Sequence, residues 1–284
     1  MELLIACKKE QIDYALKLIE GGADVNQIDE NRDSPLIWAC WQALSEVALK
    51  LIENGANVNQ INRDQYSPLI WACQNKLSEV VLKLIEKGAN VNQINDNQEP
   101  PLIWACLNGL SEVALKLIEN GANINQIDQE QSSPLIYACS NGSSEVALKL
   151  IENGANVNQI NIFQESPLTL ACLNGLSEVA LKMIENGVNV NHQYGGEKFP
   201  LTLACSKELS KVSLKLIENG AYLNDILNTP HVNFLNRMIY NKYFIPLLIL
   251  YNRNNNSDSS GSCCQLNRLP MLCLNMLFEL LRIK

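Results

Sequence analysis

The residues with the clearest potential for chemistry are the cysteines, because seven of the ten recur at one fixed interval. A thiol can act as a nucleophile, ligate a metal or form a disulfide. Equivalent helices of stacked repeats lie about 8–10 Å apart, whereas a disulfide needs Cα atoms within roughly 7 Å of each other. We therefore predict small core residues, rather than disulfides or a metal site, at Cys7, Cys40, Cys73, Cys106, Cys139, Cys172 and Cys205.

Other catalytic signals are absent from the sequence. The two histidines, His192 and His231, fall in loops away from the thiol row and complete no metal site with it. No phosphate-binding Gly-x-x-x-x-Gly-Lys loop, Gly-x-Ser-x-Gly elbow or His-Glu-x-x-His helix occurs. We expect solvated helix faces for the repeated glutamates, which are Glu46, Glu79, Glu112, Glu145 and Glu178. The sequence therefore predicts a protein that is not an enzyme, that has no cofactor, and that resides in a reducing compartment such as the cytoplasm.

Composition excludes further classes of function. The 284-residue chain has a net charge of −8, which argues against a protein that binds nucleic acid by neutralising phosphates. The uninterrupted apolar run of about 18 residues that a membrane span needs does not occur. The N-terminus lacks the basic segment and apolar stretch of a secretion signal. We expect a monomer with a protein partner.

The elements that position these residues repeat with the same period. Prolines recur every 33 residues from Pro35 to Pro200, and glycines do so from Gly22 to Gly220. Three residue types that share one period predict a tandem array of one partial and six full repeats. Such units bury their apolar faces by stacking on their neighbours.

The local pattern of one unit, Ser34–Gly55, predicts two helices and a loop. Ser34 is a good N-cap for a short helix, and Pro35 suits its first position. Ser45 is expected to cap the second helix. Gly55 can end that helix because it adopts the left-handed conformation without strain. The polar residues that follow predict a loop before the next unit.

Ser-Pro-Leu at 34–36 and Asn-Gly-Ala-Asn-Val-Asn at 54–59, copied through the chain, resemble the ankyrin repeat. The resemblance covers residues 1–227 and implies an all-α solenoid of stacked helix–turn–helix units with protruding loops. The family's histidine, which bonds neighbouring loops, is replaced by Ile37, Ile70, Ile103, Ile136, Thr169 and Thr202. The family's loop glycine is replaced by Arg32, Gln65, Gln98, Gln131, Gln164 and Glu197. The loop tips must therefore turn without the conformational freedom of glycine.

The predicted domain organisation follows from where the repeat pattern weakens. The array of one partial and six full repeats occupies residues 1–227, and a degenerate capping repeat occupies 228–252. A flexible linker follows at 253–262, and an amphipathic helix at 263–284. Within the array, Pro100 and Phe199 replace the serine cap in two repeats.

Positions that vary between repeats are the candidates for partner binding, since identical positions serve the repeat itself. On the expected concave face, Trp41 has the counterparts Gln74, Leu107 and Leu173. A tryptophan suits a binding hot spot; the alternative is that Trp41 covers the first repeat. The next row, whose amides would bond a partner's backbone or water, is Gln42, Asn75, Asn108 and Asn174. The candidate residues at the loop tips are Arg63, Asp64, Tyr66, Asp96, Ile162 and Phe163.

Three more rows are expected to serve the array. A core ladder, with ligand stacking as the alternative role, is predicted for Trp38, Trp71, Trp104 and Tyr137. Bonds to neighbouring loop backbones are predicted for Asn26, Asn59, Asn92, Asn125, Asn158 and Asn191. Mutual packing is predicted for Ile28, Ile61, Ile94, Ile127 and Ile160.

The tail differs from the array in charge and in pattern. Residues 228–284 carry a net charge of +4, which leaves −12 on the array. An acidic array favours a partner with a basic surface. Leu269, Leu272, Cys273 and Leu277 resemble the elongin-binding box of SOCS-box proteins, and Leu269-Pro270 resembles the start of an F-box. Either resemblance implies an adaptor of a cullin-type ubiquitin ligase; the alternative is a helix that folds back onto the array's end.

Overall fold

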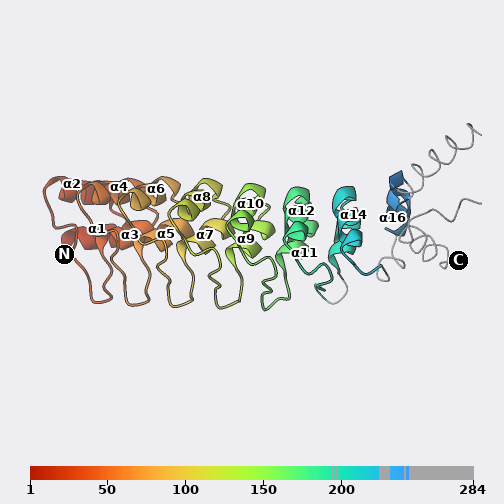
Figure 1. Ribbon diagram of the computed structural model, residues 1–284. Helices are drawn as coiled ribbons and strands as arrows, with labels where there is room; N and C mark the ends of the chain where they lie inside the picture. Colours follow the sequence, from red (N-terminus) through yellow and green to blue (C-terminus); the bar gives the residue numbers. More distant parts are fainter. Residues whose placement is uncertain (194, 196–197, 224–230, 240, 243–284) are drawn as a thin grey trace, which may run out of the picture. The chain divides into compact units, whose positions relative to one another are not determined.

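The computed structural model describes residues 1–193, 195, 198–223, 231–239 and 241–242 (Figure 1). The chain divides into two compact units, Met1–Asp225 and Ile226–Lys284. The tail residues Leu269, Leu272, Cys273 and Leu277 lie outside the described residues, as do the predicted linker and terminal helix. The part of the second unit that is described includes α16 (Val232–Ile239), which buries Leu235 and Met238.

The first unit is built of helix pairs, as the repeat pattern predicts. The first helices of the pairs are α1 (Glu2–Lys8), α3 (Pro35–Trp41), α5 (Pro68–Gln74), α7 (Pro101–Leu107), α9 (Pro134–Ser140), α11 (Pro167–Leu173) and α13 (Pro200–Ser206). The second helices are α2 (Ile12–Glu20), α4 (Ser45–Glu53), α6 (Ser78–Glu86), α8 (Ser111–Glu119), α10 (Ser144–Glu152), α12 (Ser177–Glu185) and α14 (Ser210–Glu218). This arrangement confirms the all-α solenoid of helix–turn–helix units.

The helices form two layers, and the loops project from the layer of first helices (Figure 1). Each first helix contacts the first helices before and after it, and the second helices contact each other in the same way. The core lies between the layers, where α3 buries Leu36 and Cys40 and α4 buries Val47 and Leu51. Because every repeat buries side chains at equivalent positions, this core is continuous along the unit.

The predicted caps of the first helices are confirmed, whereas the predicted cap of the second helix is wrong. The Ser34 Oγ accepts a hydrogen bond from the Ile37 backbone N–H at 3.2 Å, as expected of an N-cap. Pro100 and Phe199 provide no such bond, also as expected. The prediction that Ser45 caps the second helix is wrong, because Ser45 is its first residue and Leu44 is the N-cap. The left-handed turn at Ala43 brings Leu44 into the core instead.

The five loops that lead into α3, α5, α7, α9 and α11 turn without glycine by placing another residue in the left-handed conformation. Gln98 has φ of 63°, and the Asn95 side chain braces the turn around it. The Asn95 Oδ1 accepts hydrogen bonds from the backbone N–H groups of Asn97 at 3.1 Å and Glu99 at 2.9 Å. Such Asx turns offset the strain of a left-handed non-glycine residue. The same bonding pattern recurs at Asp29, Asn62, Asp128 and Asn161.

The row that begins with Asn26 bonds successive loops, which confirms the prediction for these asparagines. The Asn92 Oδ1 accepts from the Asn123 backbone N–H at 2.7 Å, and the Asn92 Nδ2 donates to the Gly121 carbonyl at 3.0 Å. We call this row the asparagine ladder; it comprises Asn26, Asn59, Asn92, Asn125, Asn158 and Asn191. It joins each repeat to the next at the side where the loops leave the second helices.

Candidate functional site

The thiol row is part of the core and is not a reactive site. All seven in-register cysteines are buried and unpaired. Burial raises the pKa of the Cys106 thiol to about 12, which leaves almost no thiolate at neutral pH. Within the described part of the chain, no group of three or more His, Cys, Asp or Glu side chains could hold a metal ion.

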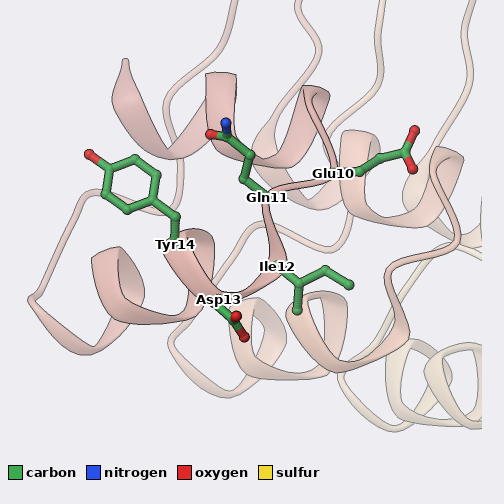
Figure 2. Close-up of a pocket in the computed structure, with 5 residues that line it drawn as sticks. All are labelled: Glu10, Gln11, Ile12, Asp13 and Tyr14. Atoms are coloured by element: carbon green, nitrogen blue, oxygen red, sulfur yellow. The ribbon is translucent and has the colours of Figure 1, made fainter.

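A surface hollow lies beside the turn between α1 and α2 and is lined by Glu10, Gln11, Ile12, Asp13 and Tyr14 (Figure 2). The lining is one consecutive stretch, and its side chains fan out in different directions. The Tyr14 hydroxyl donates to the Glu2 carboxylate at 3.1 Å. An active site brings groups from several elements to one point, and this hollow does not.

The most distinctive cluster of side chains is an aromatic stack on the first helices. The Trp41 ring lies 4.6 Å from the Trp38 ring and 5.3 Å from the Trp71 ring, centroid to centroid, with interplanar angles of 24° and 18°. The Tyr66 ring lies 4.3 Å from the Trp71 ring at 19°. The stack therefore runs Trp38, Trp41, Trp71, Tyr66, and it joins α3, α5 and the loop that leads into α5. Trp41 remains 43% exposed.

Charged groups surround both ends of this stack. The Lys8 ammonium lies 4.7 Å from the centre of the Trp38 ring, a cation–π contact. At the other end, burial raises the pKa of the Tyr66 hydroxyl, and the nearby carboxylates of Glu99, Asp64 and Asp96 raise it further. The field at Tyr66 is thus negative, so this end of the stack favours positive groups.

The aromatic row predicted as a core ladder is only partly buried. Trp38 is 5% exposed, and its indole N–H donates to Asp29 at 3.4 Å. Trp71, Trp104 and Tyr137 are half-buried, so they also form part of the surface. Within the described residues, the buried Nε1 atoms of Trp71 and Trp104 and the Oε1 atom of Gln74 have no hydrogen-bond partner.

The amide row has an intramolecular role that the sequence analysis did not consider. The Asn75 Nδ2 donates to the carbonyls of Cys40 at 3.0 Å and Trp41 at 2.8 Å, at the C-terminal end of the preceding first helix. Carbonyls at a helix end lack partners within the helix, and these amides supply them. The expectation that the amide donors bond a partner's backbone or water is therefore corrected, since the same pattern holds for Asn108 and Asn174, and the Gln42 amide bonds Lys8.

The remaining candidates lie on the surface that the first helices share with the loops. Leu107 is 43% exposed, whereas Gln74 and Leu173 are half-buried. At the loop tips, Arg63, Asp64 and Asp96 are exposed, and Tyr66 is half-buried in the stack. Ile162 and Phe163 are 53% and 55% exposed, although the Ile162 backbone N–H donates to the Glu130 carbonyl of the preceding loop at 3.0 Å.

The isoleucine row is less buried than its predicted mutual packing suggests. Ile28 is 47% exposed and Ile94 is 39% exposed, while Ile61, Ile127 and Ile160 are half-buried. The row lies on the loops at the foot of each Asx turn. It therefore contributes apolar area to the loop surface.

Comparisons with known proteins agree with this architecture. The family profile described as ankyrin repeats (3 copies) matches residues 3–95, 69–161 and 135–226. A crystal structure of the human ASB11 ankyrin repeat domain is similar with a TM-score of 0.58 and 29% sequence identity. That match covers 77% of this chain and 97% of the other. A search of curated protein sequences found no match. No helix in the described ranges is long and apolar enough to cross a membrane.

Proposed function

The chain belongs to the ankyrin repeat family. We propose that it is a non-catalytic module that captures a partner protein on the surface shared by its first helices and loops. The observation that carries the proposal is the stack of Trp38, Trp41, Trp71 and Tyr66, which leaves the Trp41 ring 43% exposed. An ordered, partly exposed tryptophan loses little conformational entropy on binding, so it suits an interface anchor.

The other proposed contacts extend from this anchor along the array. Leu107 and Leu173 provide apolar area in the row of Trp41, and Ile162 with Phe163 provides it at one loop tip. The charged tips and the net charge of −12 on residues 1–227 support a partner with a basic surface. We propose that the amides of Asn75, Asn108 and Asn174 hold the first helices in register under that partner and contact it only through their oxygens.

Mutagenesis of the two exposed aromatic residues tests the module. Trp41→Ala and Phe163→Ala are each introduced into the full chain, and partner capture is measured by proximity labelling alongside the melting temperature. We expect capture to fall while the melting temperature stays close to that of the unchanged protein. Tyr14→Ala is the matched control, because Tyr14 is 46% exposed but lies on α2 in the other layer. If both variants lower capture and melting temperature together, these rings belong to the core rather than to an interface.

A second proposal concerns the tail. The pattern of Leu269, Leu272, Cys273 and Leu277 supports an adaptor of a cullin-type ubiquitin ligase, in which the array would select the substrate. Co-purification of the elongin B/C pair with the full chain tests it. We expect Leu269→Ala combined with Cys273→Ala to abolish co-purification, while array contacts stay intact. Failure of the intact chain to retain elongin B/C contradicts the adaptor proposal and leaves the interaction module standing.

We also propose a reducing compartment, such as the cytoplasm, for this protein. Seven unpaired thiols in one continuous core support it, because exchange among them during folding in an oxidising compartment would trap wrong pairings. Folding in oxidising and in reducing buffer, followed by size-exclusion chromatography, tests this. Equal yields of monomer under both conditions would argue against it.

A further inference from the structure

We propose that the aromatic stack of Trp38, Trp41, Trp71 and Tyr66 binds an arginine side chain carried by an extended segment of the partner. The inference rests on the proposed interaction module and names the chemistry that its anchor recognises. Three observations point to it: the rings form one ordered platform, carboxylates surround the platform, and polar atoms beside it lack partners.

The rings present a surface suited to a flat cation. Centroid separations of 4.3–5.3 Å and interplanar angles of 18–24° make each neighbouring pair of rings nearly parallel. Trp41 and Trp71 each lie between two other rings, and Lys8 lies over Trp38, so the π face that attracts a further cation through the ring quadrupole is the one at the Tyr66 end of the stack. The array already uses this attraction at one end, where the Lys8 ammonium lies 4.7 Å from the Trp38 ring centre.

The charges around the stack favour a cationic ligand. The loops that flank it, residues 26–34, 59–67 and 92–100, contain six carboxylates against two arginines, Arg32 and Arg63. In addition to burial, the negative charges of Asp64, Asp96 and Glu99 raise the pKa of the Tyr66 hydroxyl. Lys8 is the further positive group near the platform, and it is engaged by the Trp38 ring. A positive group from outside would therefore gain attraction at the Tyr66 end.

Arginine fits these features better than lysine does. Its planar guanidinium can stack on the aromatic face at the Tyr66 end while its edge keeps N–H groups free for carboxylates. The Gln74 Oε1 atom, which has no hydrogen-bond partner, can accept one of these N–H groups after rotation of the amide. The Nε1 atoms of Trp71 and Trp104 also lack partners, but they are buried, so a backbone carbonyl of an extended segment could reach them only if the indole rings shifted.

Intrinsic fluorescence offers a direct assay, because all four tryptophans of the chain lie on α3, α5 and α7. The full chain is titrated with a short glycine–serine peptide that carries arginine, and with versions in which lysine or uncharged citrulline replaces the arginine. We expect the arginine peptide to bind most tightly. We expect the citrulline peptide to bind at least about tenfold more weakly, since it keeps the shape of arginine without its charge.

Variants of the chain assign the binding to the stack. Trp41→Ala should lower the affinity for the arginine peptide by about 5- to 30-fold, and Trp41→Phe should restore part of the lost affinity. Asp64→Asn and Asp96→Asn should each weaken it by up to about fivefold, because these charges are exposed. Tyr14→Ala on α2 should change nothing. Unchanged circular dichroism of each variant excludes loss of folding as the cause.

The outcomes separate this inference from the proposed function. Equal binding of the arginine and citrulline peptides overturns it, and so does binding that Trp41→Ala leaves intact. Equal binding of the lysine peptide also overturns it, because the stack would then select charge alone. Self-association of the chain that Trp41→Ala abolishes would assign the stack to a second copy. Capture of a protein partner through Trp41 without any response to the arginine peptide would leave the interaction module standing and refute only the arginine site.

Discussion

Replacing Asn92 with alanine would test whether the asparagine ladder joins neighbouring repeats. The Asn92 side chain makes two hydrogen bonds to the following repeat, one from the Asn123 backbone N–H at 2.7 Å and one to the Gly121 carbonyl at 3.0 Å. Both partners lie 29 to 31 residues further along the chain, so neither bond is local. The substitution therefore removes contacts between repeats and leaves the helices themselves unchanged.

The size of the effect follows from these two bonds. A hydrogen bond contributes about 0.5–1.5 kcal/mol net to stability. Asn92 is exposed, so water can replace part of each bond in the variant. We therefore expect the free energy of unfolding to fall by about 1–2 kcal/mol. Because a solenoid is held together by nearest-neighbour interfaces, this loss falls on one interface, between the second and third full repeats.

Urea unfolding of the full chain, followed by circular dichroism and tryptophan fluorescence, measures this effect. Asn97→Ala is the matched control, since Asn97 is an exposed asparagine in the same loop whose backbone alone bonds Asn95. We expect the control to stay within about 0.5 kcal/mol of the unchanged protein. Asn92→Asp keeps the acceptor oxygen and should fall between the two. Equal destabilisation by Asn92→Ala and Asn97→Ala would refute the idea that the ladder couples repeats.

Three more predictions follow from single features of the array. Burial raises the pKa of Cys106 from 9.0 to about 12, so the unfolded chain alone ionises this thiol just above pH 9. The free energy of unfolding therefore keeps its full contribution from this thiol below pH 9 and loses it as pH rises toward 12, by up to about 1.4 kcal/mol per thiol per pH unit. Urea titrations of the unchanged protein and of Cys106→Ala should diverge between pH 9 and 12. Ser133→Ala should cost about 1 kcal/mol through loss of the 3.3 Å bond from the Ile136 N–H, whereas Ser143→Ala, at an N-cap with no side-chain bond, should cost far less by thermal melting. Gln131→Gly should leave stability equal or raise it by up to about 1 kcal/mol, because φ of 60° strains glutamine; a clear loss in chemical denaturation would show that the Gln131 side chain supports the loop.

Sequence reasoning was strongest where one repeat suffices to explain a residue. The Ser34 cap, the buried Cys40 and the loop asparagine Asn59 all follow from position within the unit, and the structure confirms each. It was wrong at Ser45, because the left-handed turn before it decides which residue enters the helix. The Asx turns at Asn62 and its equivalents were missed, although an Asp or Asn at one fixed place in the first five loops was a usable signal.

The period of 33 residues determined the fold of this protein by itself. Each unit carries its own helix caps and apolar faces, and copies of one unit have no way to bury those faces except by stacking on each other. The fold class, the buried thiol row and the asparagine ladder can therefore be predicted from the sequence of a single repeat, and the six further copies repeat the same pattern.

Only the tertiary structure decided which side chains make up the proposed binding surface. Trp41 and Trp71 lie 30 positions apart in sequence, and the 5.3 Å between their rings depends on how α3 and α5 stack. The same stacking turns the Asn75 amide back onto the Cys40 carbonyl and away from a partner. A row of equivalent residues can point to a neighbour or to solvent, and the distance and rotation between adjacent repeats settle which of the two occurs.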